Sequence, residues 1–157
     1  KIEENQLHLD SDANETGSGV VLDGTAHWDN YRLTATVESP SQTGVLLWVR
    51  MEDNKNHAAC NFGNGFVHVE ETINNVRSVI KGERRANLTI PAGQFTVSAE
   101  VEGRRVSCYL NDKKLVETTF LDQTLERGGV GIKIWDAEAG KSEVWVKQVE
   151  VTEVETL

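Results

Sequence analysis

Strict alternation of side-chain character between residues 43 and 81 constrains the fold of this chain more than any other feature. From Val45 to Met51, every second residue is apolar, and the residues between them are Leu46, Trp48 and Arg50. A period of two is the signature of a β-strand with two different faces. Turn signals divide the segment at residues 52–55, 63–65 and 74–75. The segment therefore predicts four consecutive antiparallel strands joined by tight turns.

Shorter alternating runs fill the rest of the chain, and Gly, Asn and Asp residues separate them. No window shows helical periodicity with capping residues, and Pro91 interrupts the longest connection, residues 82–93. About a dozen short strands with turn signals predict an all-β fold, a two-sheet antiparallel β-sandwich or jelly roll. The 157 residues suit one domain with a real core, so we expect residues 1–157 to form a single module.

The net charge of −9 argues against nucleic acid as a partner, because phosphate binding needs a basic surface. It also argues, more weakly, against polyanionic glycans. A hydrophobic content of 38% and a charged content of 26% are typical of soluble globular proteins. No apolar run reaches the ~18 residues of a membrane span. The polar start Lys1–Glu4 does not resemble a signal peptide, and we expect a mature form or an excised module.

The polar set of alternating positions in residues 43–81 predicts a ligand-binding face. It comprises Trp48, Arg50, His57, Asn61, His68, Glu70 and Arg77. Aromatic rings cover the apolar C–H face of a sugar, and planar polar groups hydrogen-bond its hydroxyls. We expect Arg50 and Glu70 to form the ion pair that grips vicinal hydroxyls, and Trp135 to provide a second stacking platform. The alternative is an ordinary solvated sheet face.

Two cysteines, Cys60 and Cys108, fall on the expected core side of their strands. A disulfide between them is possible, but core positions on facing sheets lie ~10 Å apart. We therefore expect two buried free thiols. Their spacing fits no zinc motif.

No catalytic residues are predicted. A retaining hydrolase needs two carboxylates on one face, with ~5–5.5 Å between the carboxyl groups. Glu70 and Glu71 have opposite strand parity, and Glu100 and Glu102 flank a hairpin turn. The four histidines are dispersed, which argues against a metal centre.

Several segments together resemble the concanavalin A-like lectin/glucanase superfamily. They are Trp28–Leu33, Gly44–Leu47, Asn56–Gly63, Gly93–Val97, Val106–Asn111 and Gly129–Ile132. Within it, the chain is most similar to non-catalytic β-sandwich modules of bacterial glycoside hydrolases, such as the module of family-51 α-L-arabinofuranosidases and the fructan-binding module of levanases. The resemblance covers residues 28–151 and implies two curved sheets with a ligand on the concave face or its rim.

From the resemblance we expect a non-catalytic carbohydrate-binding module of a secreted polysaccharide-degrading enzyme. It would be monomeric, tethered to a catalytic domain, and would bind a neutral polysaccharide or oligosaccharide. A glycoside hydrolase of the same fold and a purely structural sandwich that braces a catalytic domain remain open. No cofactor is required, but a structural calcium occurs in this superfamily, with Asp23, Asp29 and Asp136 as candidate ligands. The simpler expectation is that these are ordinary turn aspartates.

Overall fold

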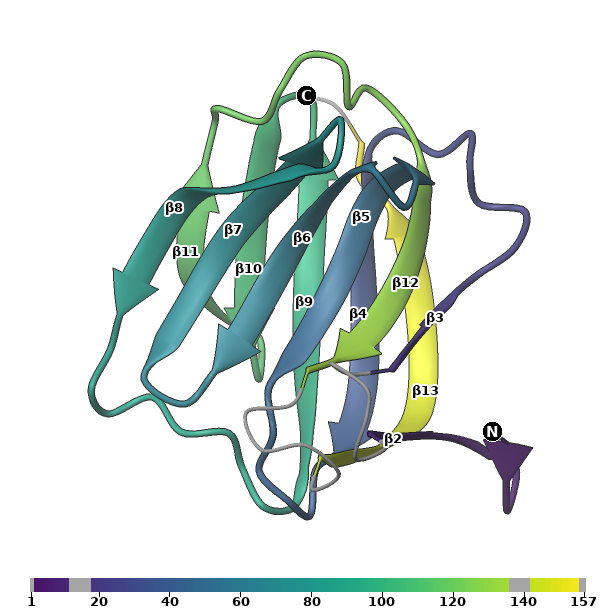
Figure 1. The fold of residues 1–157 in the computed structure, drawn as a ribbon, viewed down its shortest axis with the longest axis vertical. Coiled ribbons are helices and arrows are strands. Elements are labelled where there is room, and N and C mark those ends of the chain that lie inside the picture. The colour runs from purple at the N-terminus through teal and green to yellow at the C-terminus, as the bar shows by residue number, and fades with distance from the viewer. Residues whose placement is uncertain (1, 12–17, 136–141, 156–157) are drawn as a thin grey trace.

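The computed structural model describes residues 2–11, 18–135 and 142–155. Two antiparallel sheets pack face to face, as predicted (Figure 1). The six-stranded sheet has the order β3 (Gly19–Val21), β12 (Gly129–Ile134), β5 (Val45–Asp53), β6 (Asn56–Gly63), β7 (Phe66–Ile73), β8 (Val76–Arg84). The seven-stranded sheet has the order β1 (Ile2–Glu3), β2 (Gln6–Asp10), β13 (Glu143–Glu153), β4 (Tyr31–Glu38), β9 (Gln94–Glu102), β10 (Arg105–Leu110), β11 (Lys113–Thr118).

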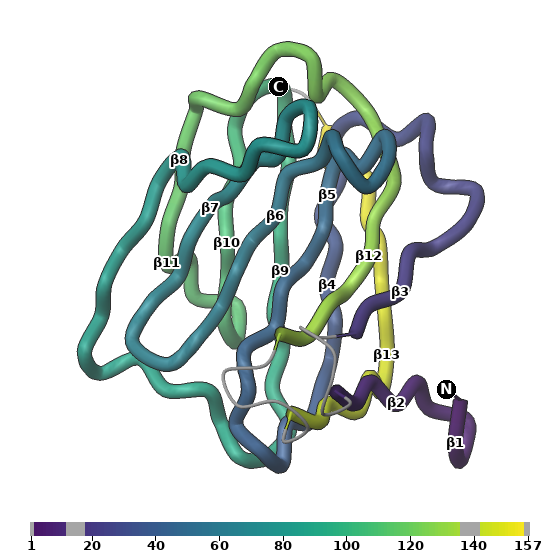
Figure 2. The backbone as a smooth tube through the Cα atoms, in the orientation of Figure 1, coloured from purple at the N-terminus to yellow at the C-terminus, as the bar shows by residue number. Residues whose placement is uncertain are grey.

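The four sequential strands β5 to β8 are neighbours in one sheet, which confirms the prediction for residues 43–81. Figure 2 shows this part of the backbone as a continuous meander across one layer of the sandwich. In the β7–β8 turn, Asn74 and Asn75 have φ values of 50° and 67°, the left-handed region that asparagine tolerates. No helix in the described part of the chain is long and apolar enough to cross a membrane.

The core lies between the two sheets and is formed by the apolar half of the alternation. On β4, Tyr31, Leu33, Ala35 and Val37 are buried, whereas the residues between them are partly exposed. On the opposite sheet Val45 and the alternate residues after it bury their side chains against this layer. Because register fixes which side chains face inward, the remaining positions face outward wherever the pairing of β5 to β7 is regular.

Cys60 on β6 and Cys108 on β10 form a disulfide between the two sheets, so the prediction of free thiols was wrong. Their Cα atoms are 5.8 Å apart, well below the mean sheet separation on which that prediction relied. Small core side chains, Ala58 on β6 and Ala99 opposite Cys108, leave room for the close approach. Such a bond is typical of oxidising, extracytoplasmic compartments.

Arg50 does not face outward beside Trp48, and this prediction was also wrong. The pairing of β5 with β6 is regular up to Val49 and then shifts register, and Arg50 has a φ of 50°. This backbone conformation turns the side chain inward, where it is 1% exposed. Alternation therefore fails at the one position where the strand is irregular.

Buried Arg50 links the loops at one end of the sandwich. Its guanidinium donates to the carbonyls of Asp29, Leu125 and Gly103 at 2.8, 2.6 and 3.2 Å. Its backbone N–H donates to the Tyr31 hydroxyl at 2.9 Å. Burial lowers the pKa of Arg50 and raises that of Tyr31 to about 12.

Candidate functional site

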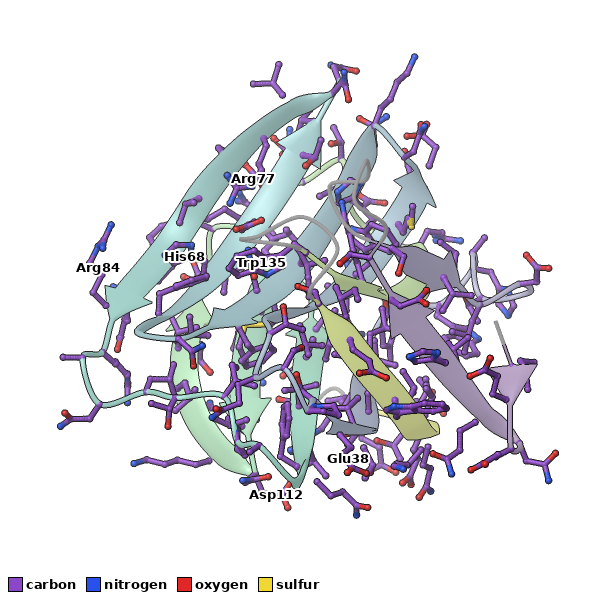
Figure 3. The ribbon with its side chains drawn as sticks, turned by 60° about the horizontal axis from the view of Figure 1, so that its bottom comes forward. Glu38, His68, Arg77, Arg84, Asp112 and Trp135 are labelled. Carbon is purple, nitrogen blue, oxygen red and sulfur yellow. A yellow bond between two sulfur atoms is a disulfide. The ribbon has the colours of Figure 1, made fainter. Side chains whose placement is uncertain are left out.

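The outer face of the six-stranded sheet is hollowed into a groove of about 590 Å³. Every residue predicted for the ligand-binding face lines this groove, except Arg50. The lining residues are Leu46, Trp48, Asn54, His57, Ala59, Asn61, Phe66, His68, Glu70, Thr72, Arg77, Lys133 and Trp135. Figure 3 shows His68, Arg77 and Trp135 on this side of the molecule, with Glu38 and Asp112 on the opposite side.

Strand register arranges the groove as transverse rows. One row runs Lys133, Leu46, Asn61, His68 and Gly82 from β12 to β8. The next row runs Gly131, Trp48, Ala59, Glu70 and Val79. A third row pairs His57 with Thr72 and Arg77.

A chain of hydrogen bonds crosses the groove from Trp135 to Arg77. Trp135 Nε1 donates to Asn61 Oδ1 at 2.9 Å, and Asn61 Nδ2 donates to Glu70 Oε1 at 2.8 Å. These two bonds fix which way the Asn61 amide points. Arg77 Nε donates to Glu70 Oε2 at 2.9 Å, and its Nη2 contacts Oε1. The four side chains form one connected network on the sheet surface.

Arg77, and not Arg50, is the ion-pair partner of Glu70. The Glu70 carboxylate is buried, with a side chain 5% exposed, whereas the Arg77 side chain is 58% exposed. The hydrogen bond to Glu70 is the main cause of the raised pKa of Arg77. Because Glu70 is bound on both oxygens, it orients Arg77, and the remaining N–H groups of the guanidinium are free to bind a ligand.

Glycines beneath the rings allow the aromatic side chains to lie flat on the sheet. A Cβ atom placed on Gly131 would come within 2.9 Å of the Trp48 ring, and one on Gly44 within 2.4 Å of the Trp135 ring. The same holds for Gly63, where a Cβ would come within 2.3 Å of Phe66. The rings thus occupy the space above residues that have no side chain, and this shapes the groove as a wide, shallow surface.

Trp48 lies between two nitrogen-bearing side chains. The His57 ring is 6.0 Å from it in an edge-to-face arrangement, and the Lys133 ammonium is 5.9 Å from its ring centroid. Burial is the main cause of the lowered pKa of His57. The charges of Asp53, Lys133 and Glu70 also act on this pKa. His57 Nδ1 has no hydrogen-bond partner among the described residues. At neutral pH this end of the groove therefore offers an aromatic face, a neutral imidazole and one ammonium group.

The groove lacks the paired acids of a retaining hydrolase among its described lining residues. Glu70 is the one carboxylate there, and Arg77 holds it. Glu71 points to the other side of β7, as its parity predicted, where it accepts a hydrogen bond from the backbone N–H of Asp122 at 3.0 Å.

The candidate calcium ligands are not brought together in the part of the chain that the structure describes. Asp23 and Asp29 are exposed, and Asp136 lies outside the described residues. Asp29 accepts a hydrogen bond from its neighbour Asn30, which is typical of a turn aspartate. The described residues contain no group of three or more acidic, histidine or cysteine side chains that could hold a metal ion. The calcium site stays a prediction.

Among the groove-lining residues that sequence reasoning missed are Phe66 and Lys133. Both share strand parity with predicted members, Phe66 with His68 and Lys133 with Trp135. Parity would therefore have placed them on the same face, had the whole set of alternate positions been taken and not only the residue types expected to bind sugars.

The fold has solved counterparts. The carbohydrate binding module CBM66 from Bacillus subtilis superposes with a TM-score of 0.71 over 95% of this chain and 92% of that chain, at 16% identity. The Caenorhabditis elegans galectin LEC-6 gives a TM-score of 0.58 over 98% of this chain and 100% of that chain, at 17% identity.

The chain has the concanavalin A-like lectin/glucanase fold. A native glycosidic hydrolase also matches, with a TM-score of 0.67 over 97% of this chain and 80% of that chain, at 10% identity. No protein-family model and no curated protein sequence matches the chain. At these identities the likeness establishes the lectin-like β-sandwich, and the predicted resemblance is confirmed at the level of the fold.

Proposed function

We propose that this protein is a non-catalytic carbohydrate-binding module, and that the groove on the six-stranded sheet is its glycan site. The observation that carries the proposal is the groove itself. Trp48 offers a ring face, and the network from Trp135 to Arg77 offers fixed hydrogen-bonding groups on the same surface. An apolar platform beside oriented polar groups is what a pyranose or furanose requires.

The network is pre-formed, which favours binding of flexible glycans. Asn61, Glu70 and Arg77 are held by one another, and Trp135 donates to the same network. A ligand does not have to order these side chains, so less binding energy is lost on association. The groove is nevertheless shallow and ordering the glycan opposes binding, so we expect modest affinity.

The wider setting follows from the fold and the disulfide. The matched chain from Bacillus subtilis is described as a carbohydrate binding module, and the Cys60–Cys108 bond is typical of extracytoplasmic proteins. We expect a secreted module, monomeric and tethered to a polysaccharide-degrading catalytic domain. The described groove has one carboxylate, bound by Arg77, which is why we favour binding over hydrolysis.

A glycan array followed by a reducing-sugar assay tests the proposal. The intact chain should retain at least one class of polysaccharide on the array and release no reducing ends from it. Turnover of the bound glycan, abolished by Glu70→Gln, would show a hydrolase of the same fold instead. Failure to retain any glycan would leave the purely structural sandwich as the better account.

A further inference from the structure

The groove face has the opposite charge balance to the chain as a whole. The protein carries a net charge of −9, yet the paired rows of the described groove face hold three cationic side chains and one carboxylate. Lys133 lies on β12, and Arg77 and Arg84 lie on β8 opposite Thr72 and Phe66, both of which face the groove. Figure 3 shows Arg84 and Arg77 along the same edge of the sheet.

The single carboxylate does not neutralise all of this charge. Glu70 is bound by Arg77 and Asn61, so one cation is balanced. Lys133 and Arg84 form no ion pair with a described residue. Asp53, at the end of β5, accepts hydrogen bonds from Lys55 N and Asn56 Nδ2. The uncompensated charge of the groove is therefore positive.

The position of Lys133 says where an anionic group would sit. Its ammonium lies 5.9 Å from the centroid of Trp48, the platform on which a sugar ring would stack. The ammonium lies over the Trp48 ring, so the substituents of a sugar ring bound there would meet it. A carboxylate or sulfate there would gain a charge-assisted hydrogen bond, whereas a hydroxyl would gain a weaker one.

We infer that the groove binds a glycan unit bearing a carboxylate or a sulfate, with the ring on Trp48 and the anionic group at Lys133. This inference rests on the proposed function, because it names the ligand class of the same groove. It departs from the expectation of a neutral glycan, which relied on the charge of the whole chain. Charges farther than about 8 Å are largely screened at physiological ionic strength, so the local cations outweigh distant acids.

Matched glycan pairs separate charge from ring shape. One pair is a galacturonate trisaccharide and its fully methyl-esterified form, and a second pair is a sulfated galactan oligosaccharide and its desulfated form. Calorimetric titration of the intact chain should show at least tenfold tighter binding to the charged member of one pair. The pair that shows the preference identifies the anionic group. Raising the salt concentration should weaken this preference.

Lys133→Gln should abolish the preference for the charged member, so that the variant binds the two members of the pair about equally. Lys81→Gln is the matched control, because Lys81 on β8 pairs with the core residue Val69 and so points away from the groove. Melting curves of both variants establish that each is folded.

Equal or tighter binding of the neutral members, or a preference that survives in Lys133→Gln, would overturn the inference while the proposed function stands. Neutral glycans bound on an array with no preference in either pair would have the same meaning. No binding to any glycan, charged or neutral, would overturn both.

Discussion

The indole of Trp135 lies so close to Gly44 that a Cβ atom on Gly44 would come within 2.4 Å of the ring. The three atoms nearest to such a Cβ all belong to the Trp135 ring, so a side chain at residue 44 must displace the indole. Displacement breaks the hydrogen bond from Trp135 Nε1 to Asn61, and with it one end of the network that holds Glu70 and Arg77.

Gly44→Ala should therefore weaken glycan binding about tenfold while costing roughly 1–3 kcal/mol of stability through overpacking. Titration calorimetry and a melting curve measure the two effects. Gly93→Ala is the control, since a Cβ at residue 93 meets nothing within 4 Å. Unchanged affinity in Gly44→Ala would mean that the position of Trp135 does not matter to the site.

Arg50 is predicted to act on stability and not on binding. Arg50→Met removes donors from the buried carbonyls of Asp29, Leu125 and Gly103, at a cost of about 2–4 kcal/mol in the free energy of unfolding. Urea unfolding measures the loss, with Arg127→Met, an exposed arginine of the same end, as control. Loss of glycan affinity by folded Arg50→Met protein would return this residue to the site.

The Cys60–Cys108 bond should be a major source of stability. It joins residues 48 apart in the sequence, for which loop-closure entropy predicts about 4 kcal/mol. The double variant Cys60→Ala, Cys108→Ala should lose roughly this amount in urea unfolding. Thiol titration of the unfolded wild type should find no free thiol before reduction. Two titratable thiols would restore the sequence-based expectation.

His57 should make stability depend on pH near neutrality. Burial lowers its pKa in the folded state, so the folded protein favours the neutral ring more than the unfolded chain does. Its contribution is full above the unfolded pKa, about 6.5, and is lost as the pH falls through that value toward the folded pKa. Between pH 8 and pH 5, the free energy of unfolding of the wild type should fall more steeply than that of His57→Gln. His27→Gln, at an exposed position, should behave as wild type, and identical slopes for wild type and His57→Gln would contradict the assignment.

Period-two alternation predicted the sandwich and most of the groove because parity fixes which side of a strand each residue occupies. Trp48, Asn61 and Glu70 lie together for that reason. Parity gives no warning of a register shift, and Arg50 was misplaced because the strand is irregular after Val49. Parity also does not say which side chains pair with each other. The structure was therefore needed to show that Arg77, and not Arg50, pairs with Glu70.

The disulfide escaped prediction for a different physical reason. Mean sheet separation describes the sandwich as a whole, whereas two facing strands can approach much closer where core side chains are small. Ala58, two residues before Cys60, and Ala99, which pairs with Cys108, are such side chains, but which strands face each other is decided by the tertiary structure. Local sequence could suggest the possibility and could not decide it.

Titration calorimetry of wild type and Trp48→Ala against the best glycan from the array tests the central claim most directly. Trp48 is partly exposed on the groove face, so its loss should cost about 1–3 kcal/mol of binding, enough to erase weak affinity, with the melting temperature nearly unchanged. Trp28→Ala, a tryptophan outside the groove lining, serves as the comparison for binding. Loss of affinity in folded Trp48→Ala protein is the predicted result. Equal affinity of wild type and Trp48→Ala would contradict the account and place the glycan site elsewhere on the molecule.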